Sequence, residues 1–109
     1  MHSAVETGKI SRAERRRREE VARIKSRLIV AGLTLTQIDK RFGLPAGTAG
    51  NSIHEPNVAG ERAIAAALGT RPHLLWFSRY SPSGERRHPQ PAENYRYGRR
   101  AIPPTSEAA

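Results

Sequence analysis

The sequence predicts an all-α protein built around a helix-turn-helix, and three observations lead to this prediction. Apolar residues recur at helical spacing in several short segments between residues 12 and 76. Two of these segments meet at a single glycine, Gly43, as two helices joined by a tight turn do. A further apolar helix and a short segment containing Trp76 follow. Together they describe a small helical domain.

Composition limits the kinds of protein that this chain can be. At 109 residues and 37% hydrophobic content, it is expected to form one small domain with tails. The absence of cysteine excludes disulfides and thiolate metal sites and suits a reducing compartment. Apolar runs fall far short of the roughly 20 residues of a membrane helix, and the first residues lack a secretory apolar segment. We therefore expect a cytoplasmic protein with no membrane partner.

The net charge of +9 indicates a polyanionic partner, and it is concentrated in the flanks. Residues 1–32 carry a net +5, whereas residues 33–80 and 81–109 carry +2 each. We predict a basic, partly disordered arm over 1–17, a helix-turn-helix domain over 18–80, and a disordered, basic, proline-rich tail over 81–109. The alternative is that the basic flanks only keep the protein soluble.

The first predicted helix begins at Arg12 and ends before Gly32, which suits a left-handed C-terminal stop. Opposite charges at i,i+4 spacing favour extension of this helix through its arginine run. Only the part from about Val21 onward has enough apolar residues to dock on a core. The apolar positions of the pattern are Ala13, Val21, Ile24, Leu28 and Ala31.

The second helix is predicted to begin after Thr34, which forms a capping box with Gln37. It extends to about Phe42 and buries Leu35, Ile38 and Phe42. Gly43 then allows a sharp turn, because glycine adopts a positive φ without steric cost. The third helix is predicted over 45–53, with Pro45 at its first position.

Two more helices complete the predicted domain. The fourth covers about 60–68, buries Ala63, Ile64, Ala67 and Leu68, and stops at Gly69. The fifth is short, begins at Pro72 after Thr70 and Arg71, and buries Leu74, Leu75 and Trp76.

Four residues occupy apolar core positions of a helix-turn-helix, namely Ile38, Phe42, Leu44 and Ala49. Two positions do not conform. Asp39 stands where a small residue is usual because the helices cross there, and Ser52 stands where a branched apolar residue is usual. The alternative is an ordinary helical hairpin that binds nothing.

The third helix carries the residues that we expect to read bases. The Asn51 amide can pair bidentately with adenine, and small side chains beside it can approach thymine methyl groups. The predicted base-reading residues are Ala46, Gly47, Thr48 and Asn51. The predicted phosphate-binding residues are Thr34, Gln37, Lys40, His54, Arg15, Arg16, Arg17 and Arg18.

Residues 33–80 resemble the Ner/Nlp (SfsB-like) family of Mu-like phage and bacterial regulators. The resemblance is carried by Leu33-Thr34-Leu35-Thr36, Phe42-Gly43, Asn51, Gly60-Glu61, Ile64-Ala65, Ala67-Leu68, Arg71-Pro72 and Trp76-Phe77-Ser78-Arg79-Tyr80. It implies a λ-repressor-like, five-helix DNA-binding domain and a transcriptional regulator, negative in the phage case. Three residues depart from the family pattern. Phe77 replaces proline, Gly47 replaces a polar residue, and Ala49 replaces a large core residue.

The expected function is therefore sequence-specific binding of double-stranded DNA in transcriptional regulation, as a repressor, with the third helix in the major groove. We expect no enzyme, no cofactor and no metal, because the four histidines lack ligand spacing and no nucleophile pairs with a base. Further expected partners are a second copy on DNA and the transcription machinery. The alternatives are a protein-binding adaptor with a degenerate helix-turn-helix, or a non-specific nucleoid or RNA-binding protein.

Overall fold

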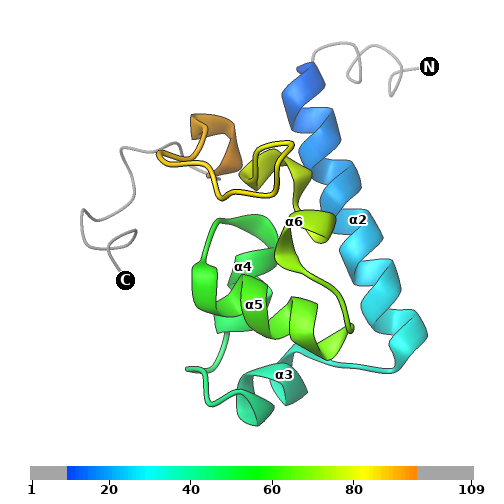
Figure 1. Cartoon of the computed structure of the whole chain (residues 1–109). Helices are drawn as coiled ribbons and strands as arrows, with labels where there is room; N and C mark the ends of the chain where they lie inside the picture. The colour runs from blue at the N-terminus through cyan, green and yellow to red at the C-terminus, as the bar shows by residue number, and fades with distance from the viewer. Residues whose placement is uncertain (1–9, 96–109) are drawn as a thin grey trace, which may run out of the picture.

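The computed structural model describes residues 10–95, and residues 1–9 and 96–109 lie outside the described part (Figure 1). The five α-helices are α2 (Arg12–Ala31), α3 (Leu35–Arg41), α4 (Thr48–His54), α5 (Val58–Ala67) and α6 (Pro72–Leu75). Two 3₁₀ turns follow, η1 (Phe77–Arg79) and η2 (Ala92–Asn94). Apart from one isolated bridge between Tyr80 and Arg86, regular structure within residues 10–95 is helical. The predicted all-α, five-helix class is confirmed.

Helix α2 lies along one side of the molecule (Figure 1). It begins after Ser11, whose side chain accepts a hydrogen bond from the Glu14 amide, and ends at Gly32 with a φ of 71°. The predicted residues Ile24 and Leu28 are buried. Ala13 and Ala31 are exposed, contrary to the predicted pattern. Both lie near the ends of the helix, beyond the part that packs on the core.

The capping box of Thr34 and Gln37 at the start of α3 is present as predicted. Gly43 takes a φ of 67°, so the predicted glycine turn is also confirmed. Phe42 corrects the prediction of a buried residue, because 37% of it is exposed. The guanidinium of Arg41 lies 5.4 Å from the centroid of the Phe42 ring and covers the ring in a cation–π contact.

Helix α4 begins at Thr48 rather than at the predicted Pro45 and ends at His54. Pro45 lies in the preceding turn, where its carbonyl accepts a hydrogen bond from the Thr48 amide at 3.1 Å. Gly47 is the N-cap, with a φ of 91° that side chains rarely adopt. Because Gly47 has a positive φ, the helix begins after it and not at Pro45. The pattern of residue types did not reveal this φ.

Helices α5 and α6 follow the prediction with small differences. Helix α5 begins at Val58, ahead of the predicted Gly60, because the Asn57 side chain accepts from the Gly60 amide at 2.9 Å and caps the helix. Helix α6 begins at Pro72 as predicted. Leu74 corrects the prediction of burial, since half of it is exposed.

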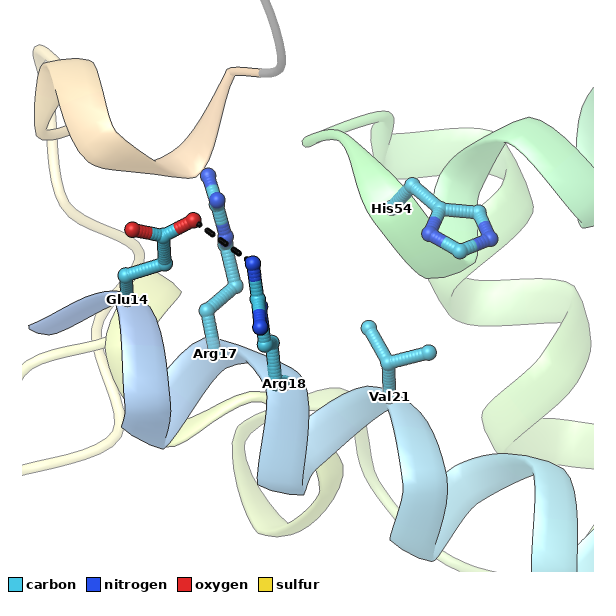
Figure 2. Close-up of a pocket in the computed structure, with 5 residues that line it drawn as sticks. All are labelled: Glu14, Arg17, Arg18, Val21 and His54. Atoms are coloured by element: carbon cyan, nitrogen blue, oxygen red, sulfur yellow. Dashed lines mark hydrogen bonds and ion pairs between the residues drawn. The ribbon is translucent and has the colours of Figure 1, made fainter. Parts of the chain in front are cut away.

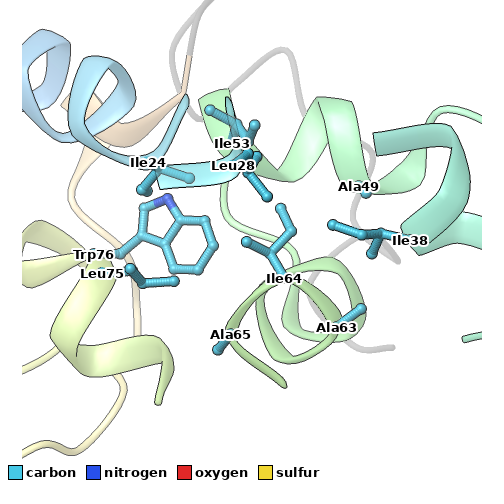
Figure 3. Packing of buried hydrophobic residues seen from close by; sticks show 10 residues of the cluster. All are labelled: Ile24, Leu28, Ile38, Ala49, Ile53, Ala63, Ile64, Ala65, Leu75 and Trp76. Atoms are coloured by element: carbon cyan, nitrogen blue, oxygen red, sulfur yellow. The ribbon is translucent and has the colours of Figure 1, made fainter. Parts of the chain in front are cut away.

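The core is a single cluster to which all five helices contribute (Figure 3). Trp76 and Leu75 lie beside Ile24 at one end of the cluster, and Ile64 lies toward its middle. The buried members are Ile24, Leu28, Ile38, Ala49, Ile53, Ala63, Ile64, Ala65, Leu75 and Trp76. Ala67 and Leu68, which the sequence predicts to be buried, pack against this cluster while partly exposed.

Residues 81–95 correct the prediction of a disordered tail beginning at residue 81. Gln90, Asn94 and Tyr95 are at most 4% exposed. The Gln90 amide donates to the carbonyls of Arg79 at 3.0 Å and Arg87 at 2.8 Å. This segment therefore packs on the helices largely through polar side chains. For this reason no apolar periodicity in the sequence indicated that it is ordered.

Candidate nucleic-acid interface

The residues predicted to read bases lie at the beginning of α4. Ala46 and Gly47 stand in the turn just before the helix, Thr48 is its first residue, and Asn51 lies one turn further on. Ala46, Gly47 and Asn51 are exposed, and Thr48 is half-buried. The fold thus gathers the four residues, although Ala46 and Gly47 lie outside the helix that was expected to carry them.

Asp39 holds the amino end of α4. Its two carboxylate oxygens accept hydrogen bonds from the Gly47 and Ala49 amides, each at 2.8 Å. Asp39 is buried, and α4 has no cap from its own N-cap side chain. A carboxylate here satisfies two amides and suits the positive end of the helix dipole. The residue that did not fit the motif is therefore the cap of the next helix.

Arg79 holds the carboxyl end of the same helix. Its guanidinium donates to the carbonyl of Ser52 at 2.7 Å and to the carbonyl of Ile53 at 3.1 Å. Only 2% of the residue is exposed. A cation at this end satisfies carbonyls that the helix leaves unpaired and suits the negative end of its dipole. Sequence reasoning missed this role, although Arg79 lies three residues after the core residue Trp76, in a block that carries the family resemblance.

Glu61 holds Arg79 in place from α5. Its fully buried carboxylate accepts from Arg79 at 3.0 Å, from the Tyr80 hydroxyl at 2.7 Å and from the Asn57 amide at 2.8 Å. Burial lowers the pKa of Arg79, and the neighbouring Glu61 charge opposes that shift. Burial, with the hydrogen bond to Glu61, raises the pKa of Tyr80, so its hydroxyl stays protonated as a donor.

The second unusual motif residue, Ser52, is explained by a close approach between α4 and α5. A Cβ atom built on Gly60 would lie 2.5 Å from the Ser52 Cβ. Ser52 is fully buried, and its hydroxyl donates to the Ala49 carbonyl at 2.7 Å. A branched apolar side chain at position 52 would therefore need the two helices to separate.

The predicted phosphate-binding residues of α3 and its N-cap lie on the protein surface. Thr34, Gln37 and Lys40 are exposed. The capping box uses the Thr34 oxygen and the Gln37 carbonyl oxygen as acceptors. The Thr34 hydroxyl proton and the Gln37 amide protons can still be donated to a phosphate.

The arginine run on α2 divides into two parts. Arg17 and Arg18 line a pocket with Glu14 and Val21, and His54 at the end of α4 forms its opposite wall (Figure 2). The remaining two, Arg15 and Arg16, are exposed on α2 outside this pocket. The fold therefore brings His54 together with half of the arginine run.

The two helices α3 and α4 joined by a glycine turn, with exposed residues at the start of α4 and basic side chains on α2 and α3, are typical of the class of helix-turn-helix DNA-binding domains. Residues 19–92 match the family described as winged helix-turn-helix DNA-binding, and the chain belongs to that family. No solved structure shows a significant match to the chain.

Two curated relatives agree with the resemblance noted in the sequence. Sugar fermentation stimulation protein B of Escherichia coli K12 is 40% identical over 57 residues, which cover 48% of this chain and 62% of that protein. The negative regulator of transcription of Escherichia phage Mu is 35% identical over 57 residues, covering 48% and 76%. The chain thus spans about three-fifths of the first relative. The predicted Ner-like resemblance is confirmed.

The segment that follows η1 is where the described residues come nearest to a β-hairpin. The Tyr80–Arg86 bridge closes a turn in which the Ser81 amide donates to the Glu85 carbonyl at 2.7 Å.

Within residues 10–95, no helix is long and apolar enough to cross a membrane. No group of three potential metal ligands occurs in that range either.

Proposed function

We propose that this protein is a sequence-specific, double-stranded DNA-binding regulator of transcription that acts as a repressor, with α4 in the major groove. The observation that carries the proposal is the way in which both ends of α4 are held in place. Buried Asp39 and Arg79 fix its two ends, while Ala46, Gly47 and Asn51 stay exposed. A helix of seven residues held in this way can present side chains to base edges with little loss of conformational entropy.

In this proposal Asn51 is the principal reader, because its amide matches adenine in the major groove. Thr48 and Ala46 supply methyl groups for thymine, and Gly47 allows the backbone to approach the bases. The name of the phage Mu relative supports negative regulation of transcription.

Phosphate contacts in this proposal come from both sides of α4. Thr34, Gln37 and Lys40 on α3 contact the backbone on one side, and His54 with Arg15–Arg18 contacts it on the other. We further propose that two copies pair on the operator and contact the transcription machinery in the bacterial cytoplasm.

The test is selection of bound duplexes from a random-sequence pool, followed by competition between the enriched and a scrambled duplex. We expect a recurrent motif, bound at least tenfold more tightly than the scrambled duplex. Equal affinity for all duplexes would support non-specific nucleoid binding instead. Absence of duplex binding would support the protein-binding adaptor.

A further inference from the structure

The pocket between α2 and the end of α4 has a volume of about 270 Å³ (Figure 2). Arg17, Arg18 and His54 contribute three basic side chains, Val21 an apolar wall, and Glu14 a carboxylate. The α2 residues have i, i+3, i+4 and i+7 spacing, which places them on one face of the helix. The pocket has the size and donors to hold a single tetrahedral oxyanion.

A carboxylate already engages one of the two guanidinium groups. Glu14 and Arg18 form an ion pair at 3.1 Å, with side chains 37% and 62% exposed. Pairs this exposed contribute little to stability, so a competing anion can displace the carboxylate. Phosphate oxygens offer arginine the same bidentate geometry as a carboxylate.

The pocket adjoins the surface proposed to read bases. His54 follows Asn51 by three residues, so the two side chains lie on one side of α4. A phosphate at the edge of the groove occupied by α4 would therefore meet His54 on one wall and the two arginines of α2 on the other.

We propose that this pocket binds one phosphodiester of the DNA backbone, and that Glu14 competes with that phosphate for Arg18. This inference rests on the proposed function, since the phosphodiester comes from the duplex in which α4 lies. Glu14 thereby weakens DNA binding and keeps Arg18 from holding unrelated anions.

The first test compares Glu14→Gln with Glu19→Gln in the full chain. Both changes remove one negative charge from α2, but Glu19 is exposed and lies outside the pocket. Long-range repulsion of DNA falls equally in both, so any difference is local. We expect Glu14→Gln to bind duplex DNA about two- to fivefold more tightly than Glu19→Gln, the range that an exposed ion pair allows. Equal affinities would overturn the proposal.

The second test compares Arg18→Gln with Arg27→Gln, since Arg27 is exposed on α2, lies outside the pocket and is not among the proposed phosphate contacts. Loss of a phosphate contact should make the slope of log K against log salt shallower by about 0.9 for Arg18→Gln only. Adding Glu14→Gln to Arg18→Gln should then give less gain than it gives the wild type. Far-UV circular dichroism checks that α2 stays helical in each variant. Equal slopes for the two arginine variants would contradict the pocket.

Each titration uses the enriched duplex, a scrambled duplex and inorganic phosphate, which separates the possible failures. Suppose that Glu14→Gln binds more tightly than Glu19→Gln on both duplexes, but neither duplex is preferred. The pocket proposal then stands and the proposal of sequence-specific function fails. If the enriched duplex is preferred without this difference between the variants, the function stands and the pocket proposal fails. A difference seen only with inorganic phosphate would assign the pocket to a free anion and overturn the proposal.

Discussion

Asn51 is the residue of α4 at which we expect a change of side chain to alter sequence preference. It is exposed, and its backbone carbonyl accepts the final hydrogen bond of the helix from Glu55 at 3.0 Å. The main chain at residue 51 therefore keeps its role whatever side chain it carries. Removal of the side-chain amide, with a check on the fold, therefore tests base reading.

We expect Asn51→Ala to relax the sequence preference while leaving binding to scrambled duplex nearly unchanged. Loss of a bidentate base contact should cost about 1–3 kcal/mol at one base pair. Repeating the duplex selection with the variant measures this, and thermal unfolding checks the fold. An unchanged binding motif would show that Asn51 is not a reader.

Gly50 offers a second prediction, because a Cβ at this position would point into the protein. It would meet the Leu35 Cδ1 atom at 3.7 Å, an ordinary contact distance. We expect Gly50→Ala to raise the free energy of unfolding by about 0.5–1 kcal/mol, since glycine is costly within a helix. Denaturant titration measures the gain, and DNA affinity should stay at the wild-type value. Weaker DNA binding by a more stable variant would indicate that the backbone at Gly50 approaches the duplex.

Among the elements, α4 depends most on residues distant in sequence. Asp39 lies on the preceding helix α3, Arg79 lies on η1 after α5 and α6, and Glu61 on α5 orients Arg79. A seven-residue helix is too short to be stable by itself. Its order must come from these contacts and from the burial of Ala49 and Ile53.

We expect Arg79→Lys to loosen α4 more than the rest of the domain. A lysine can neutralise Glu61, but it lacks the planar fork that reaches two carbonyls at once. The free energy of unfolding should fall by about 1–3 kcal/mol. Amide hydrogen exchange should accelerate in α4 beyond its increase in α2, with the exposed Arg71→Lys as the matched control. Equal acceleration in both helices would argue against a specific role at α4.

Local signals explain which parts of the fold were predictable. The Thr34–Gln37 box, the glycine stops at 32 and 43, and proline at the start of α6 depend on neighbouring residues, and each was predicted correctly. The caps supplied by Asp39 and Arg79 depend on partners up to 27 residues away. Glu20 likewise binds the Ser78 amide across 58 residues. Residue-type patterns do not encode such pairings.

The whole molecule should respond to alkaline pH through Tyr80. Its pKa is raised above the ordinary value of 10.0, so above that pH the unfolded chain loses the proton while the folded chain retains it. Stability is therefore fully present below about pH 10 and falls as the pH rises further. Denaturant titration between pH 8 and about pH 11 measures this, and Tyr80→Phe should flatten the decline. An equally steep decline in Tyr80→Phe would assign the effect to other groups.

Charge at the ends of the chain is expected to add affinity without specificity. Residues 96–109 carry three arginines and one glutamate. Removing residues 1–9 and 96–109 should leave the preferred sequence unchanged and make the salt slope shallower by about 0.9 for each lost phosphate contact. A salt series with full-length and shortened chains measures both. Equal slopes would support a solubilising role for these ends.

A chain that ends at residue 80 should be compared with the chain that ends at residue 95. The shorter chain also lacks Gln90, Asn94 and Tyr95, which are buried against the helices. We therefore expect this shorter chain to lose thermal stability as well as affinity relative to a chain that ends at residue 95.

The attachment of Arg79 to the end of α4 also sets an order of events during synthesis. The motif of α3 and α4 leaves the ribosome well before Arg79, which binds a carbonyl 27 residues earlier in the chain. Chains are made from the N-terminus at about 5–20 residues per second, so α3 and α4 are synthesised before the Arg79 that binds the end of α4. A growing chain that ends before Arg79 should therefore contain the residues proposed to read bases without the contact that fixes the end of α4. We therefore expect the growing chain to become able to bind DNA only once Arg79 can reach the end of α4.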